Sequence, residues 1–117
     1  MRLDRLKAFV LALPHATFVK QWGETLVFKI GGKMFLIVSL DGDLIEACAF
    51  KCIPADNARL TTEVDGIIPA RYNMFKSQWV QLEDPDALTE TQFKEHVRIA
   101  YSLVKTGLPK KLQAELV

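Results

Sequence analysis

Two lysines flank a Gly-Gly pair and are the first residues in this sequence that suggest a chemistry. Lys29 and Lys33 lie on either side of Gly31-Gly32. Ammonium groups hold phosphates, and a hairpin tip is able to reach into or across a nucleic-acid groove. No acidic residue lies between Gly66 and Leu82. Further basic residues would extend such a surface, namely Lys51, Arg71, Lys76, Lys110 and Lys111. The alternative is that they are ordinary solvated side chains whose aliphatic stems lie over apolar strands.

A second candidate site combines aromatic side chains with polar ones. Aromatic rings stack on bases or line small-molecule pockets. Five residues would together form a small-ligand pocket or a protein-interaction surface, with Lys51 as a further polar group. They are His15, Trp22, Phe50, Tyr72 and Trp79. The competing interpretation is that these rings pack in the core or at its rim. Trp22, next to Gly23, is the member that most favours a binding role.

His15 is the residue on which an enzymatic interpretation would depend. A general base needs a partner within hydrogen-bonding distance, and the sequence identifies none. It contains no Ser–His–Asp pattern, no Gly-x-Ser-x-Gly motif and no P-loop. We therefore expect a non-enzymatic protein without catalytic residues, in which His15 caps or bonds a neighbouring backbone group. An enzyme that uses His15 remains a rival hypothesis.

Metal and cofactor sites are not expected. Cys48 and Cys52 lie four residues apart in an alternating segment, so in one strand they point the same way about 13 Å apart. That separation is too large for a disulfide or a shared metal, and two buried thiols are expected instead. One cluster of carboxylates could suit a hard cation and comprises Glu83, Asp84, Asp86 and Glu90. It falls where a loop meets the N-terminus of a predicted helix, and the helix dipole favours acidic residues there without any metal.

Composition limits the class of protein. The chain has 117 residues, of which 50% are hydrophobic, and a formal net charge of +1. This length fits one domain, residues 1–117, with a core of its own. The charge excludes a strongly basic histone-like protein. No apolar run approaches the roughly 20 residues that span a bilayer, and residues 1–7 alternate charge with leucine, unlike a secretory signal. We therefore expect a cytoplasmic protein with reduced cysteines.

The elements that position these residues follow from hydrophobic periodicity. Leucine and valine recur at helical spacing from Leu3 to Leu13, and Pro14 ends that helix. A strand is predicted over residues 16–22. Two alternating runs joined by Gly31-Gly32 predict a hairpin with a two-residue loop. That loop would pair Phe28 with Phe35 and place Leu26, Phe28, Phe35 and Ile37 on one face, opposite Val27, Leu36 and Val38. Because both faces are apolar, we expect this hairpin to be central and partly covered on each side.

The rest of the chain alternates strands with two helices. A strand over residues 45–52 follows the turn Asp41-Gly42-Asp43. A short helix is predicted from Pro54 to Val64, and short strands at 67–69 and 79–82 flank an irregular segment, 71–77. Thr89 and Gln92 fit a capping box for a last helix that Gly107 and Pro109 end. Tight turns favour a mainly antiparallel sheet with N-terminal and C-terminal helices packed on it, an α+β fold.

An ordered series of short segments resembles the MmcQ/YjbR family of small bacterial proteins. The resemblance covers residues 13 to 82, and the ending Leu108-Pro109-Lys110-Lys111 is similar too. No single motif is distinctive, whereas the series is: Leu13-Pro14-His15-Ala16-Thr17, Trp22-Gly23, residues 27–35, Phe50-Lys51-Cys52, residues 66–72, and Trp79-Val80.

The resemblance implies a frataxin-like (CyaY-like) α+β fold, also described as a double wing, and a role in DNA binding. Fold analogy is the main basis for that role. The chain departs from the family at one place, where an acidic residue often follows the segment that ends at Thr17. Here the sequence reads Phe18-Val19-Lys20. The expected protein is therefore a DNA-binding module that contacts phosphates through the Gly-Gly hairpin, and the alternative is a small-ligand or protein-interaction domain.

Overall fold

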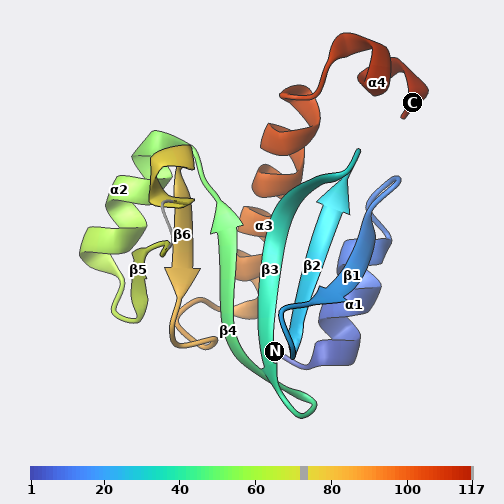
Figure 1. Ribbon diagram of the computed structural model, residues 1–117. Coiled ribbons are helices and arrows are strands. Elements are labelled where there is room, and N and C mark those ends of the chain that lie inside the picture. Colours follow the sequence, from blue (N-terminus) through green and yellow to red (C-terminus); the bar gives the residue numbers. More distant parts are fainter. Residues whose placement is uncertain (72–73, 117) are drawn as a thin grey trace.

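A six-stranded antiparallel sheet forms the centre of the fold (Figure 1). The computed structural model describes residues 1–71 and 74–116, and at 75 and 77 it describes the backbone alone. The strand order is β1-β2-β3-β4-β6-β5. The elements in chain order are α1 (Leu3–Leu11), β1 (Thr17–Gln21), β2 (Thr25–Ile30), β3 (Lys33–Asp41), β4 (Leu44–Lys51), α2 (Pro54–Glu63), β5 (Ile67–Pro69), the 3-10 turn η1 (Met74–Ser77), β6 (Trp79–Leu82), α3 (Glu90–Thr106) and α4 (Lys110–Glu115). The predicted α+β class and the antiparallel sheet are confirmed.

Helices cover one face of the sheet. In Figure 1, α1 and α3 lie behind the strands, and α3 contacts β2, β3 and β4. Leu6 and Val10 of α1 and Val97 of α3 are fully buried in the core between helices and sheet. Within the described part of the chain, no α-helix crosses the front of β2, β3 and β4. We call that front surface the open face; its side chains are Thr25, Val27, Lys29, Ile37, Ser39, Ala47, Ala49 and Lys51.

The central hairpin has the predicted loop and an unpredicted bulge. Ile30 pairs with Lys33, as the predicted two-residue loop requires, but Phe28 pairs with Leu36 because the register shifts by one residue. Phe35 is the extra residue of this β-bulge, so both Phe35 and Leu36 are buried. The predicted pairing of Phe28 with Phe35 is therefore wrong.

The bulge also reverses the faces of the residues that follow it. Leu36 and Val38 join the helix-covered core, and Ile37 lies on the open face. Strict alternation would have placed Ile37 in the core. The bulge is stabilised by burial, because the Phe35 ring meets the Tyr101 ring edge-on at 5.5 Å.

The core contains both cysteines. Cys48 and Cys52 are free and buried, as predicted. Burial raises the pKa of both thiols to about 12. They therefore remain protonated at neutral pH and pack as small apolar side chains.

The helix ends agree with the sequence patterns in part. The capping box of α3 is confirmed, since Thr89 Oγ1 accepts from the Gln92 N–H and Gln92 Oε1 accepts from the Thr89 N–H. The first helix ends at Leu11, two residues before the predicted end. The helix α4 was not predicted, because Pro109 was interpreted only as a stop. Proline also fits just before or at the start of a helix, where its missing N–H has no helical partner, and Pro109 is the N-cap of α4.

His96 makes the stability of this core depend on pH. Its imidazole is 9% exposed and stacks on the Phe50 ring with centroids 5.5 Å apart. Burial lowers the pKa of His96 below its ordinary value, although the charge of Asp56 acts in the opposite direction. The unfolded chain therefore binds this proton more readily. Above the ordinary histidine pKa of about 6.5, His96 is neutral in both states and does not lower the free energy of unfolding. As the pH falls below that value, the unfolded chain takes up the proton first, and the free energy of unfolding declines.

When the pH is lowered from about 7.5 to about 5.5, the free energy of unfolding of His96→Leu should fall less than that of the wild type. Urea unfolding at the two pH values measures the difference. His15→Gln removes the exposed histidine and is the control, which should lose as much as the wild type. Equal losses in all three proteins would contradict this account of His96.

Candidate functional site

The two ends of the sheet carry opposite charge. β2 and β4 both run antiparallel to β3, so Lys29 and Lys51 lie at the same end as the hairpin tip with Lys33. β6 begins at that end, directly after η1 with Lys76. We call this end, with Lys29, Lys33, Lys51, Lys76, Lys110 and Lys111, the basic end.

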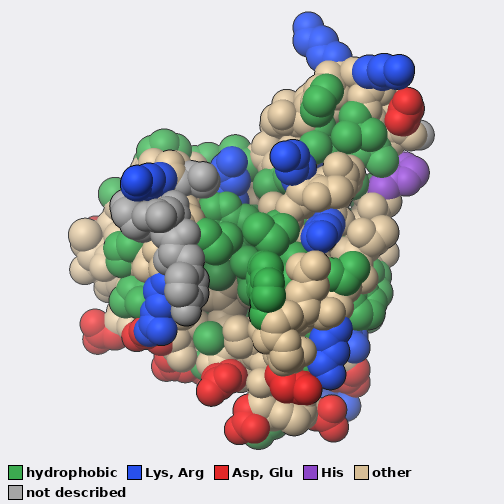
Figure 2. Space-filling model, viewed as in Figure 1, with side chains coloured by type: hydrophobic (Ala, Val, Ile, Leu, Met, Phe, Trp, Pro, Cys, Tyr) green, Lys and Arg blue, Asp and Glu red, His purple; other side chains and the backbone are tan. Residues whose placement is uncertain are grey.

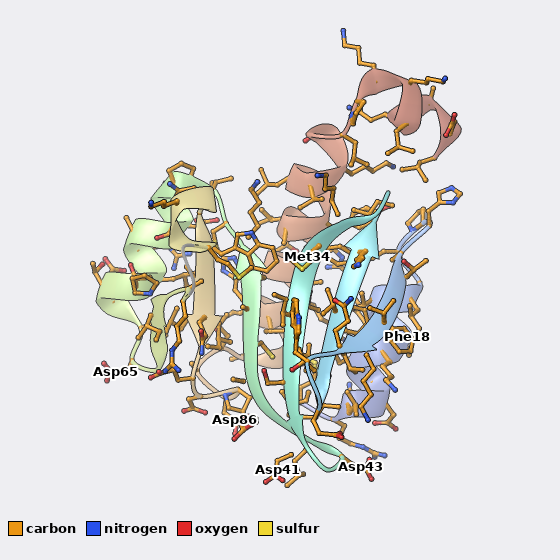
Figure 3. The ribbon with its side chains drawn as sticks, in the orientation of Figure 1. Phe18, Met34, Asp41, Asp43, Asp65 and Asp86 are labelled. Atoms are coloured by element: carbon orange, nitrogen blue, oxygen red, sulfur yellow. The ribbon has the colours of Figure 1, made fainter. Side chains whose placement is uncertain are left out.

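The acidic turns lie at the opposite end. Asp41, Asp43 and Asp86 are labelled along the lower edge of the molecule in Figure 3. Figure 2 shows Asp and Glu side chains gathered along the same edge, whereas the charged side chains of the upper end are mainly Lys and Arg. The formal charge of +1 is therefore the sum of two ends of opposite sign, so the molecule has a basic surface despite its small net charge.

The C-terminal segment packs on the hairpin tip. A Cβ atom on Gly31 would lie 2.6 Å from Leu108 Cδ1 and 3.2 Å from Leu112 Cδ2, so the backbone approaches these side chains closely. Gln113 Nε2 donates to the Leu108 carbonyl at 2.6 Å, which holds α4 against the end of α3. These contacts place the segment that contains Lys110 and Lys111 beside the tip, although it lies 77 or more residues along the chain from Lys33.

The lysines of the basic end have no carboxylate partner within the described residues. None of the six ammonium groups lies within 4.0 Å of a described Asp or Glu oxygen. Lys33, Lys76, Lys110 and Lys111 are exposed, and the other two are half-buried. Arg71 differs, because its guanidinium pairs with Glu83 at 2.9 Å, toward the acidic end. The six lysines therefore keep their charge available for a ligand.

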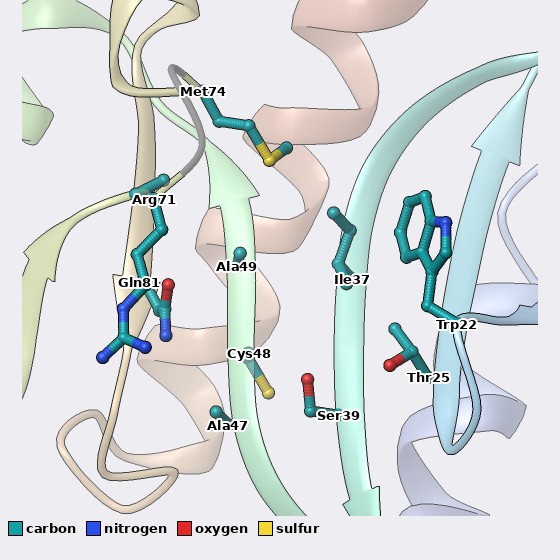
Figure 4. Close-up of a pocket in the computed structure, with 11 residues that line it drawn as sticks. Trp22, Thr25, Ile37, Ser39, Ala47, Cys48, Ala49, Arg71, Met74 and Gln81 are labelled. Carbon is teal, nitrogen blue, oxygen red and sulfur yellow. The ribbon is translucent and has the colours of Figure 1, made fainter.

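A pocket of about 650 Å³ hollows the open face (Figure 4). Trp22 forms one wall, and Arg71 and Met74 lie on the opposite side. Ile37 and Ala49 lie between these walls, and Gln81 and Ser39 contribute polar atoms. The pocket is thus mainly apolar with a few polar groups, as small-molecule sites usually are.

The aromatic set predicted from the sequence is dispersed. Trp22 lines the pocket. Phe50 lies in the core on the other face of the sheet, and Trp79 is buried with its carbonyl accepting from Asn57 Nδ2 at 3.4 Å. His15 is exposed in the turn between α1 and β1, with φ 63°. Tyr72 lies outside the described residues.

Most pocket residues were missed by the sequence analysis. The bulge at Phe35 turns Ile37 toward the pocket, and periodicity does not reveal a bulge. The small residues Ala47 and Ala49 were a usable signal, since they alternate with Cys48 and Phe50 and leave one face of β4 without bulk.

The acidic cluster is engaged in ion pairs or backbone contacts. Glu83 pairs with Arg71, and Glu90 pairs with Arg5 at 3.0 Å. Asp84 Oδ1 accepts from the Asp86 N–H at 2.9 Å. Among the described residues, no group of three or more His, Cys, Asp or Glu side chains is arranged to hold a metal ion.

Comparison with known proteins identifies the family. The family model YjbR matches residues 11–103. The chain belongs to the YjbR family. This agrees with the resemblance found in the sequence, and residues 11–103 include the hairpin, the open face and most of α3.

Relatives of this YjbR protein match most of its length. The uncharacterized protein YbdF of Escherichia coli O157:H7 is 26% identical over 113 residues, which cover 94% of this chain and 89% of YbdF. The crystal structure of Deinococcus radiodurans DR2400 is similar with a TM-score of 0.79 and 26% identity, over 98% of this chain and 87% of that one. A Pseudomonas syringae protein shares the fold, with a TM-score of 0.65, 18% identity, and 88% and 98% coverage.

One further finding concerns membranes. No helix in residues 1–71 or 74–116 has both the length and the apolar character needed to cross a bilayer.

The close approach at the hairpin tip yields a matched pair of variants. Gly31 and Gly32 both have positive φ, at 58° and 79°. A Cβ on Gly32 would meet nothing within 4 Å, whereas one on Gly31 would meet Leu108. Gly32→Ala should lower the free energy of unfolding by about 1–2 kcal/mol through backbone strain. Gly31→Ala should lower it further because Leu108 must also move. Urea unfolding measures both, and equal losses would show that α4 does not pack on the tip.

Proposed function

We propose that this YjbR protein is a non-enzymatic nucleic-acid-binding module whose basic end contacts phosphates. The observation that carries the proposal is the group of six lysines at one end of the sheet, none of them paired with a described carboxylate. Lysine and arginine contacts to phosphates supply most of the affinity for nucleic acids in many complexes, and counterion release makes it sensitive to salt.

The hairpin tip is suited to this contact. Lys29 pairs with Met34 and Lys33 pairs with Ile30, so the two lysines lie on opposite faces of the same hairpin. A phosphate chain that crosses the tip would meet one cation on each side of the strands. The packing of α4 against Gly31 adds Lys110 and Lys111 to the same end.

The distribution of charge would also orient the ligand. A polyanion approaching the molecule is repelled by the acidic turns at Asp41 and Asp43 and attracted to the opposite end. The surface charges are screened over about 8 Å at physiological ionic strength. Steering and binding should therefore both weaken as salt is added.

The pocket on the open face favours a second candidate, a small-ligand domain. Its volume of about 650 Å³ and its mainly apolar lining suit a small organic molecule. Lys29 and Lys51 project from the same face, so a ligand of this pocket lies close to two cations.

Lys29→Ala combined with Lys33→Ala should weaken binding to a nucleic acid and reduce its salt dependence. Each lost phosphate contact makes the slope of log K against log salt concentration less negative by about 1, so the double variant should change the slope by up to about 2. Fluorescence anisotropy of a labelled oligonucleotide at several salt concentrations measures both effects.

The control removes two basic side chains from other surfaces. Lys20 pairs with Glu24, and Arg98 pairs with Glu95. Lys20→Ala with Arg98→Ala causes the same change in net charge and should leave the slope nearly unchanged. Wild-type protein that binds nothing at low salt, or two double variants with equal slopes, would refute the proposal.

A further inference from the structure

Trp22 is a large apolar side chain that folding does not account for. Its side chain is 69% exposed, so it contributes little to the core. Its φ is 50°, in the left-handed region that glycine and asparagine adopt with less strain. Neither burial nor backbone conformation therefore favours tryptophan in this turn, and residues kept under such strain are often functional.

The surroundings of Trp22 indicate what it contacts. Its indole forms one wall of the open-face pocket, next to Ile37 and across the pocket from Met74 and Arg71 (Figure 4). A planar, apolar ligand in the pocket would lie against the indole and over Ile37 and Ala49. Ser39 and Gln81 line the same pocket and offer hydrogen-bonding groups for the edge of such a ring.

Two lysines lie close to the pocket, two residues further along the strands that line it. Val27, Ile37 and Ala49 are aligned across β2, β3 and β4. Lys29 and Lys51 follow Val27 and Ala49 by two residues, so they lie on the same face about 7 Å further along, toward the basic end. A ligand that combines a flat ring with a phosphate nearby would match this arrangement.

We propose that the open-face pocket binds an unstacked nucleobase of a single-stranded nucleic acid, with the base on Trp22 and its phosphates on Lys29 and Lys51. This inference rests on the proposed function and adds the form of nucleic acid that is preferred. In a duplex the base faces are covered by their neighbours, and only a single strand presents a free face to an aromatic ring.

Three probes and two variants test this assignment. The probes are a labelled 12-residue oligothymidylate, a duplex of the same length, and thymidine monophosphate. Trp22→Asn removes the ring and suits the left-handed backbone, so its unfolding midpoint should equal or exceed that of the wild type. Leu44→Ala is the matched control, because Leu44 is 71% exposed and does not line this pocket.

We expect Trp22→Asn to weaken binding of the single strand by about five-fold or more, the usual loss when one stacking ring is removed. Its salt slope and its affinity for the duplex should match those of the wild type, and Leu44→Ala should bind both as the wild type does. The single strand should also quench tryptophan emission of the wild type, and this quenching should be absent in Trp22→Asn.

The outcomes separate this inference from the proposed function. Oligothymidylate that binds Trp22→Asn and wild type equally, with a normal salt slope, would overturn the pocket assignment and leave phosphate binding intact. Monophosphate that binds as tightly as the oligomer would overturn the single-strand assignment in favour of a free nucleotide. Failure of the wild type to bind either polymer at low salt would refute the proposed function itself.

Discussion

Coverage of only one sheet face by helices is the constraint on which the rest of this structure depends. The helices α1 and α3 cover Phe28, Phe50 and their neighbours, and the bulge at Phe35 adds two successive side chains to that core. Every other residue of β2, β3 and β4 must then point away from the helices. The open face, its pocket and the positions of Lys29 and Lys51 all follow from that alternation.

The separation of charge has an equally simple origin. In an antiparallel meander, successive turns lie at alternate ends of the sheet. The turn with Asp41 and Asp43 therefore lies opposite the Gly31-Gly32 turn, and the loop after β6 lies at the acidic end. A sequence that places acids in one set of turns and lysines in the other becomes bipolar on folding, even when its total charge is close to zero.

Local patterns predicted the elements, and tertiary contacts decided the site. The two-residue loop at Gly31-Gly32 and the capping box at Thr89 are specified by neighbouring residues, so both were predictable. The bulge at Phe35 arises because Tyr101, far along the chain, gives the extra ring a buried place. The position of Lys110 beside the tip similarly depends on Leu108 packing against Gly31. The lysines were identified as candidates from the sequence. The strand order was needed to show that they lie at the same end of the sheet, and the ion pairs were needed to show that no described carboxylate pairs with them.

Chemical-shift mapping tests the central claim most directly, because it locates the contact surface residue by residue. The protein is titrated with a single-stranded oligonucleotide at low salt, and the backbone amide and indole resonances are followed. The account predicts that the largest shifts cluster around residues 29–33, Lys51 and the Trp22 indole, and fade as salt is added. Shifts centred on Asp41 and Asp43 or on the outer surface of α3, or no shifts at all, would contradict it.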